Sequence, residues 1–373
     1  MKILFTGGGT IGSVTPLLAL AEELNNKFLK LNIEYQFLWL GTKNGPEREL
    51  IANYQIPFQA IFAGKLRRYF DFRNFIDPLF VFLGFIQSFW ILLKFKPSII
   101  LSAGSFVSLP VILAGWLLRI SSLVHQQDIK PSLTNKLMTP FVSRITVTFE
   151  KSLKDFPAKK TIWTGSPARK EILEGDRERG MKVFNLEKDL PVVLVLGGGT
   201  GALELNKIIL KIVEEITKFC QIIHLTGRGK FIVSEFKNAR YHPYEFLVKK
   251  MKDAYAVADL IICRAGIGTF TELAALKKPA ILIPLPYSHQ EKNARFFKDH
   301  KAVVTFFQNE LKSRNLIEKI KEILENKEGI RDSLKENIQK FTNPKAGKKI
   351  TEEILKIIGI KEFNTRLKTP EQS

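Results

Sequence analysis

At 373 residues, with 45% apolar and 25% charged side chains, the chain has a globular composition and room for two domains that each bury a core. Its two cysteines, Cys220 and Cys263, exclude a disulfide framework and fit reduced thiols in the cytosol. The net charge of +20 attracts polyanions such as nucleic acid, anionic lipid or phosphorylated substrates, and a generally basic chain with no specific anionic partner is the plain alternative.

The first residues have the pattern of a parallel α/β unit. Residues 2–6 (KILFT) predict a strand, residues 7–12 a glycine loop, and residues 16–24 a helix with Pro16 in its first turn. The run YQFLWL predicts a second strand, which ends before Gly41. One lysine and a short strand, without a small-residue cleavage site, do not predict a secretory signal.

The same pattern restarts in the second half. Residues 191–196 (PVVLVL) predict a strand, 197–202 a glycine loop, 203–216 a helix with apolar residues at helical spacing, and 221–225 (QIIHL) the next strand. Strand, glycine loop and helix in both halves predict the fold class. We expect an α/β protein of two Rossmann-like parallel-sheet domains that face a central cleft.

The expected domain division lies near Thr164. The first domain would comprise residues 1–164 and the second residues 165–342. A C-terminal amphipathic helix at about 343–360 is expected to pack back on the first domain, and residues 361–373 read as a loose polar tail.

Residues 75–96 (FIDPLFVFLGFIQSFWILLKFK) form an apolar, aromatic segment with basic flanks. Its uninterrupted apolar part of about fifteen residues is shorter than the roughly twenty that span a bilayer, so no transmembrane helix is predicted. Two interpretations stay open: a crossover helix packed in the core, or a helix whose aromatic face lies on an anionic membrane surface. The predicted membrane contacts are Arg67, Arg68, Arg73, Phe75, Phe82, Phe85 and Trp90.

Residues 7–12 (GGGTIG) match the dinucleotide-binding pattern G-x-G-x-x-G. A nicotinamide or flavin site also needs an acidic residue at the end of the second strand, and here that strand ends Leu40-Gly41-Thr42. The corresponding strand of the second half ends Leu225-Thr226-Gly227, again without an acidic residue, so we predict no cofactor and exclude a dehydrogenase. The loops instead suit the phosphates of a sugar nucleotide or a pyrophosphate-linked substrate, and a plain tight turn is the alternative for each loop alone.

A third group of motifs follows in residues 259–275 (DLIICRAGIGTFTELAA). A buried strand there leads into a helix whose first backbone N–H groups can hold a phosphate, and Glu272, one turn into the helix, can accept paired ribose hydroxyls. After the next strand, His289, Gln290 and Asn293 offer side chains suited to sugar hydroxyls.

In this order the motifs resemble the MurG family of GT-B glycosyltransferases, over nearly the whole chain. The matching stretches are GGTIGSVTP, SAGSFVSLP, HQQDIKPSLTNKL, GSPAR, GGGTGALELN, CRAGIGTFTE and HQEKNA. The resemblance implies inverting transfer of N-acetylglucosamine from UDP-N-acetylglucosamine to lipid I, a polyprenyl-pyrophosphoryl muramyl peptide, which gives lipid II for peptidoglycan. It also implies a peripheral enzyme on the cytoplasmic face of the cell membrane.

The resemblance also assigns roles to residues of this chain. Arg169 would neutralise the leaving diphosphate, Glu272 would bind the ribose, Val248 would line the uracil pocket, and His289 with Gln290 would contact the amino sugar. The remaining implied donor-binding residues are Thr10, Ile11, Gly12, Asp128, Gly199, Thr200, Gly201, Arg264, Gly266, Ile267, Gly268, Thr269, Phe270, Thr271 and Asn293. The implied acceptor-binding residues are Gly9, Thr10, Gly12, Gly104, Ser105 and Phe106.

Two departures from the family pattern fall on the catalytic residues. Ser13 stands where the family's first loop carries a histidine, and Gln126 stands where the family has a glutamate. Because a serine is too weak a base alone, we expect Asp128 to remove the proton, assisted by Ser13 and oriented by His125. The alternatives are that Asp128 only hydrogen-bonds the sugar or a loop amide, or that the chain binds without turnover.

Other classes of function stay in view beside the lipid I transferase. A related GT-B enzyme with another lipid-linked acceptor is the nearest alternative, because the departures lie on the acceptor side. A nucleic-acid-binding protein would use the charge, but the chain has no such signature, and we predict no nucleic-acid partner. No cluster of His, Asp, Glu or Cys has metal-ligand spacing, so no tightly bound metal is expected.

Overall fold

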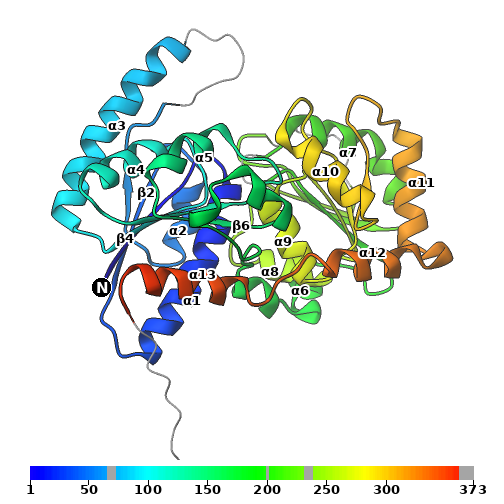
Figure 1. Ribbon diagram of the computed structural model, residues 1–373. Coiled ribbons are helices and arrows are strands. Elements are labelled where there is room, and N and C mark those ends of the chain that lie inside the picture. Colours follow the sequence, from blue (N-terminus) through cyan, green and yellow to red (C-terminus); the bar gives the residue numbers. More distant parts are fainter. Residues whose placement is uncertain (65–72, 199–200, 231–237, 361–373) are drawn as a thin grey trace, which may run out of the picture.

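The computed structural model describes residues 1–64, 73–198, 201–230 and 238–360 (Figure 1). Four residues with a predicted role, Arg67, Arg68, Gly199 and Thr200, lie outside the described residues, as does the predicted tail 361–373. The side chains of Arg73 and Phe75 are likewise outside the described part.

The first half of the chain folds around a seven-stranded parallel sheet of order β3-β2-β1-β4-β5-β6-β7. Alternation of apolar strands with helices produces this arrangement, because parallel neighbours need a crossover connection. The strands are β1 (Lys2–Thr6), β2 (Gln36–Gly41), β3 (Phe58–Ala60), β4 (Ile99–Ser102), β5 (Ser122–Gln126), β6 (Arg144–Val147) and β7 (Thr161–Trp163). The helices are η1 (Ile11–Ser13), α1 (Thr15–Lys30), α2 (Glu47–Ala52), α3 (Arg73–Phe95), α4 (Ser108–Leu117), α5 (Leu133–Met138), η2 (Thr139–Phe141), η3 (Glu150–Asp155) and η4 (Ala158–Lys160).

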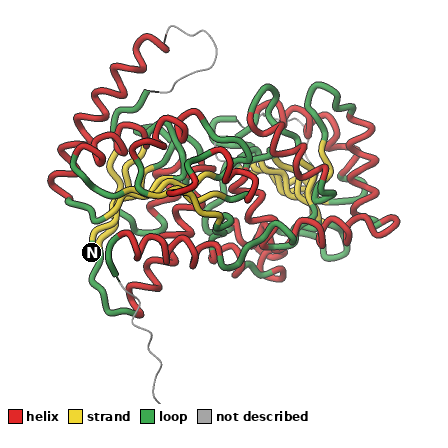
Figure 2. Tube along the Cα trace, viewed as in Figure 1, coloured by secondary structure: helices red, strands yellow, loops and turns green. Residues whose placement is uncertain are grey.

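The second half builds a six-stranded parallel sheet of order β10-β9-β8-β11-β12-β13, and Figure 2 shows the two sheets as separate groups of strands. Its strands are β8 (Val192–Leu196), β9 (Gln221–Leu225), β10 (Tyr241–Tyr244), β11 (Leu260–Cys263), β12 (Ala280–Leu282) and β13 (Val304–Thr305). Its helices are η5 (Lys170–Glu174), α6 (Arg177–Val183), α7 (Leu203–Ile216), α8 (Met251–Val257), α9 (Ile267–Ala275), α10 (His289–Asp299), α11 (Ser313–Leu324), η6 (Lys327–Gly329), α12 (Ile330–Gln339) and α13 (Ala346–Ile357). The predicted fold class is confirmed.

The bounds of individual elements agree with the sequence pattern to different degrees. Helix α7 and strand β9 have the predicted bounds. Helix α1 is longer than predicted because its apolar face continues through Leu24 and Phe28, which are fully buried. Helix α13 lies beside α1 (Figure 1), and Ile350 and Ile354 of α13 belong to the same buried core as Leu24.

Helix α3 is the crossover between β3 and β4, and it has two unlike faces. Leu92 is buried, and Phe85, Phe89 and Phe95 pack from the same helix against the core of the first sheet. The opposite face exposes large apolar side chains, namely Ile76, Leu79, Phe80, Phe82, Ile86, Trp90 and Leu93. The core-helix interpretation is therefore right for one face only. Phe85, predicted to contact a membrane, lies on the core side.

The apolar stretch of α3 is also longer than the sequence estimate. Residues Ile76–Phe95 are long and apolar enough, by length and composition, to cross a membrane. Within this stretch the buried Ser88 hydroxyl has a partner, since Ser88 Oγ donates a hydrogen bond to the Gly84 carbonyl of the same helix. Core helices of soluble proteins pass the same test, and one face of α3 is such a core face.

Candidate active site

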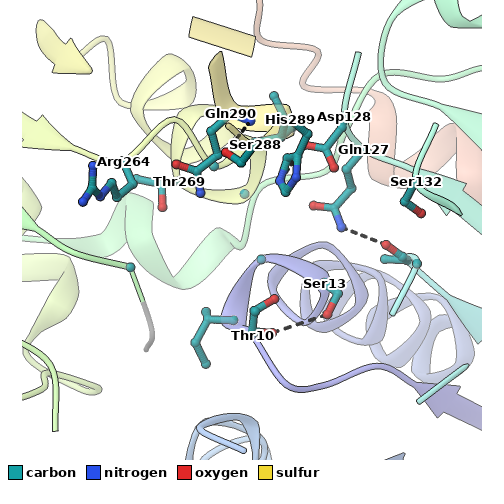
Figure 3. A pocket seen from close by; sticks show the side chains of 18 of the residues that line it. Thr10, Ser13, Gln127, Asp128, Ser132, Arg264, Thr269, Ser288, His289 and Gln290 are labelled. Atoms are coloured by element: carbon teal, nitrogen blue, oxygen red, sulfur yellow. Dashed lines mark hydrogen bonds and ion pairs between the residues drawn. The ribbon is translucent and has the colours of Figure 1, made fainter. Parts of the chain in front are cut away.

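A cleft of about 590 Å³ lies between the carboxyl ends of the strands of the two sheets, where parallel α/β folds bind ligands (Figure 3). Loops after β1, β4 and β5 supply one wall, and loops after β8, β11 and β12 supply the other. The predicted site residues on these walls are Thr10, Ile11, Gly12, Ser13, Gly104, Asp128, Arg264, Gly266, Ile267, Gly268, Thr269, His289 and Gln290.

The glycine loop after β1 is held by a buried carboxylate. Glu47, at the start of α2, accepts hydrogen bonds from the backbone N–H groups of Gly9 and Thr42 at 3.1 and 2.8 Å. Gly9 has φ +76, and a Cβ there would lie 2.5 Å from the Phe106 ring. Only glycine fits this left-handed position against an aromatic ring.

The loop after β4 is fastened to the first loop. Ser105 Oγ donates to the Gly8 carbonyl at 2.7 Å, and the Phe106 ring packs on Gly9. Ser105 and Phe106 thus join the two loops, while Gly104 reaches the cleft wall. Of the predicted acceptor residues, Thr10, Gly12 and Gly104 line the cleft itself.

Helix α9 directs its N-terminus into the cleft from the opposite side. Its N-cap is Gly266, no acidic residue lies in its first turn, and Ile267, Gly268 and Thr269 line the cleft. A Cβ at Gly268 would lie 2.5 Å from Thr15 Oγ1 at the start of α1, so only glycine permits this approach of the two halves. Free N–H groups and the helix dipole make this end favourable for an anion.

A side pocket of about 90 Å³ opens beside this helix and contains a buried ion pair. Arg169 Nε and Nη2 each lie 2.7 Å from Glu272 Oε1, and Tyr255 donates a hydrogen bond to Glu272 Oε2 at 3.0 Å. Burial opposes the charge of Arg169, but the Glu272 carboxylate together with Tyr54 and Tyr255 outweighs it, so the pKa of the guanidinium is raised. Burial, together with the Glu272 charge, raises the pKa of the Tyr255 phenol well above its ordinary value.

The same side pocket holds Val248 together with Ile11, Thr269 and the glycine loop after β8. Apolar side chains of Leu225, Phe246, Leu247 and Met251 complete its lining. An apolar slot that ends on a carboxylate suits a flat ring attached to a hydroxylated sugar.

The loop 126–130 presents Asp128 to the cleft, and Gln126 holds that loop. Gln126 Nε2 donates to the carbonyls of Asp128 and Lys130 at 2.7 and 3.2 Å, and its Oε1 accepts from Asn135 at 2.6 Å. A glutamate at this position would set an acceptor against two carbonyl oxygens. The amide is thus the residue that this loop conformation needs.

Asp128 reaches across to the second half of the molecule. Its Oδ1 accepts from Asn293 Nδ2 at 2.9 Å and lies 3.9 Å from His289 Nε2, at the start of α10. Asn293 is fully buried and also donates to the Ala265 carbonyl. Figure 3 shows Asp128 and His289 on the side of the pocket opposite Thr10 and Ser13.

The hypothesis that His125 orients Asp128 is wrong. His125 is fully buried, and its Nδ1 and Nε2 lie 2.9 and 3.2 Å from the hydroxyls of Thr146 and Thr148. With both ring nitrogens engaged by β6 and the residue after it, the imidazole cannot also hold a carboxylate. Burial lowers the pKa of His125 to about 3, so it is neutral in the folded protein. Ser13 lies on the cleft wall and donates to the Thr10 carbonyl at 3.3 Å.

Other predicted donor residues support the cleft walls. Arg264 Nη1 donates to the carbonyls of Ile283 and Pro284, which braces the loop after β12. Gln290 Oε1 accepts from the Leu285 N–H in the same loop. Four further predicted residues do not line the cleft: Gly201, which is half-buried, and the buried Phe270, Thr271 and Asn293. Phe270 stacks on Phe297 in the core, because its position on α9 faces inward.

Sequence reasoning missed two buried groups that shape the site, Tyr255 and Glu47. Both lie on helices, α2 and α8, and stand 38 and 17 residues away from their partners Gly9 and Glu272, and neither belongs to a glycine loop. Within the described ranges, no group of three or more His, Cys, Asp or Glu is placed to hold a metal ion.

Two facing parallel-sheet units with the cleft between them define the GT-B fold class. Family models agree: residues 3–147 match the glycosyltransferase family 28 N-terminal domain and residues 192–352 its C-terminal domain. A Clostridium perfringens protein named UDP-N-acetylglucosamine–N-acetylmuramyl-(pentapeptide) pyrophosphoryl-undecaprenol N-acetylglucosamine transferase is 40% identical over 338 residues, 90% of this chain and 93% of that protein. The chain belongs to this family of transferases.

Solved structures share the fold. The crystal structure of Acinetobacter baumannii MurG has a TM-score of 0.67 at 24% identity, and the comparison covers 95% of this chain and 99% of that one. A UDP-GlcNAc 2-epimerase from Neisseria meningitidis, bound to UDP-GlcNAc, has a TM-score of 0.69 at 14% identity, covering 95% of this chain and 100% of that one. Because an epimerase shares it, the fold does not by itself decide the reaction.

Proposed function

We propose that this chain transfers N-acetylglucosamine from UDP-N-acetylglucosamine to a polyprenyl-pyrophosphoryl muramyl peptide, giving lipid II. Family membership supports the reaction class. The observation that carries the proposal for this chain is the pairing of a carboxylate and a guanidinium, Glu272 and Arg169, in an apolar side pocket beside the N-terminus of α9. The three parts of UDP match these features in order: uracil the apolar slot, ribose the carboxylate, and diphosphate the anion site at the helix N-terminus.

The donor half of the site would stabilise the leaving group. As the acceptor hydroxyl attacks the anomeric carbon with inversion, negative charge grows on the diphosphate of UDP. Arg169 and the N–H groups around Thr269 would face that charge in a fixed arrangement, which is the most effective form of electrostatic catalysis. Tyr255 would keep the Glu272 carboxylate turned toward the ribose.

The acceptor half would lie at the loops after β1 and β4. Asp128 is the general base of the proposal, since it is the carboxylate on the cleft wall of the first half and is aligned by the amide of Asn293. His289, 3.9 Å from Asp128, would share in holding the amino sugar.

Closure of the two domains would exclude water from the transfer. The proposed division lies near Thr164, where the chain passes between the halves twice. Asn343 Nδ2 donates to the Thr164 carbonyl at 2.8 Å and ties the two crossings together. Bending at this point would move one wall of the cleft against the other.

A peripheral place on the cytoplasmic face of an anionic membrane is part of the proposal, and the exposed apolar face of α3 supports contact with a bilayer surface. Phe82 and Trp90 are 58% and 66% exposed, which is costly in water and favourable at a bilayer interface. Each basic residue held near anionic lipid adds about 1 kcal/mol to binding. Arg67, Arg68 and Arg73 are the proposed ones, and reversing their charge should weaken binding to anionic vesicles in a salt-dependent manner.

The proposal is tested with purified protein, radiolabelled UDP-N-acetylglucosamine and a short-chain lipid I analogue. Label is expected in the lipid product. Donor binding without transfer would refute the proposed acceptor and favour another lipid-linked one, which the Ser13 and Gln126 departures also leave room for. Conversion of the donor without any acceptor would instead indicate epimerase chemistry.

A further inference from the structure

A small apolar groove lies next to the acceptor half of the cleft. It has a volume of about 160 Å³ and lies between α3, the loop after β4 and helix α5. Its lining includes Val81, Phe106, Leu109, Ser132, Leu133 and Leu137. Leu133 and Leu137 are 42% and 41% exposed, so the groove is open along the face that α5 presents to solvent.

The groove and the cleft meet at Ser132, and the groove also adjoins the first glycine loop through Phe106. Ser132 lines both of them. Phe106 lines the groove, and its ring also packs against Gly9 of the first glycine loop. A pyrophosphate at the loops of Gly9 and Gly104 would therefore have the groove directly beside it.

We propose that this groove binds the first isoprene unit of the lipid carrier attached to the acceptor's pyrophosphate. The inference rests on the proposed function, because it takes the acceptor to be a polyprenyl pyrophosphate. In such a molecule the first apolar carbons follow the phosphate without a spacer. A polar site for the phosphate therefore needs an apolar surface next to it, and the structure has one at Phe106 and Leu133.

The size of the groove fits a short hydrocarbon. Engineered apolar cavities of about 150 Å³ take up benzene. An isoprene unit has a similar number of carbons, so the groove has room for about one unit. Beyond it, α3 continues the apolar surface with Phe80 and Phe82, where the rest of the carrier would pass toward the bilayer.

The test compares two water-soluble acceptors in the absence of membrane: a muramyl-pentapeptide diphosphate ester of a methyl group and one of a geranyl chain. The wild-type enzyme is expected to have a roughly tenfold lower KM for the geranyl ester, the effect of burying about two methylene groups. The double variant Leu133→Asn, Leu137→Asn should lose this difference, while its KM for the methyl ester, its kcat and its UDP affinity stay unchanged.

A second variant fills the groove and keeps it apolar. Val81→Phe should also abolish the preference for geranyl, whereas its binding to anionic vesicles should persist. Leu29→Asn is the matched control, because Leu29 is an exposed leucine of the same domain at the far end of α1, and it should leave the preference intact. Unchanged UDP affinity and unfolding temperature verify that each variant is folded.

The outcomes separate the groove from the proposed function. If the wild-type enzyme transfers sugar to neither ester, the proposed acceptor is wrong, and the groove proposal falls with it. If both esters react with equal KM, or the variants keep the geranyl preference, the groove proposal alone is overturned. Loss of vesicle binding in the asparagine variant with the geranyl preference retained would show that the groove takes a membrane acyl chain instead.

Discussion

Removal of the Glu272 carboxylate should reveal how far the donor pocket depends on its buried ion pair. Glu272 and Arg169 are 4% and 8% exposed, and two guanidinium nitrogens lie 2.7 Å from one carboxylate oxygen. In Glu272→Ala the guanidinium stays buried without its counterion, and Tyr255 loses its acceptor. Glu272→Gln keeps the shape and one acceptor oxygen but removes the charge.

The expected costs follow from this burial. Breaking a buried pair by removing one partner costs about 3–5 kcal/mol of unfolding free energy, so Glu272→Ala should be destabilised by about that much. Glu272→Gln should lose about 1–3 kcal/mol, since a hydrogen bond to a charged group is weakened but the space stays filled. The double variant Arg169→Leu, Glu272→Leu should recover most of the loss, because no unpaired charge remains.

Urea unfolding followed by circular dichroism measures the stability of each variant, and calorimetry measures UDP binding. All three variants should bind UDP at least tenfold more weakly, including the double variant with restored stability. A double variant as unstable as Glu272→Ala would refute the reasoning about the unpaired charge. Normal UDP affinity in Glu272→Gln would remove Glu272 from the donor site.

Three further predictions concern the base, acid stability and the membrane face. Asp128→Asn should lower kcat by a factor of about 10²–10⁴ with unchanged UDP affinity, and near-normal turnover would eliminate Asp128 as the base. Burial lowers the pKa of His125 to about 3 and of His224 to about 4, so both are neutral when folded and take up protons on unfolding below their unfolded pKa of about 6.5. The free energy of unfolding measured in urea should therefore fall by about 2.5 kcal/mol for each unit by which the pH is lowered at about pH 5. A flat profile would contradict this. Phe82→Ser with Trp90→Ser should weaken sedimentation with anionic vesicles and leave soluble turnover unchanged; equal sedimentation would exclude this face.

The sequence by itself determined the architecture. The order of apolar strands, glycine loops and amphipathic helices is local information, and it predicted two parallel sheets and the bounds of α7 and β9. The loops around the cleft were also predictable, because glycines before a helix are a local signal for an anion site. Most residues chosen on that basis line the cleft or its side pocket.

The orientation of side chains was decided only by the tertiary structure. His125 looked available to Asp128, but the neighbouring strand β6 and the residue after it supply the threonines that engage its ring. Arg264 was expected to bind the donor and it does line the cleft, but its Nη1 donates to the carbonyls after β12. The role of Tyr255 could not be predicted from the sequence, because Tyr255 and its acceptor Glu272 lie on two different helices.

The same reason explains α3, whose sequence is apolar on every side. Local periodicity cannot tell which face of such a helix will be covered, since the covering residues come from elsewhere in the chain. Packing against the first sheet buried Leu92 and left Trp90 exposed. The sequence thus specified an apolar helix with basic flanks, and only the fold decided which of its faces is open to solvent.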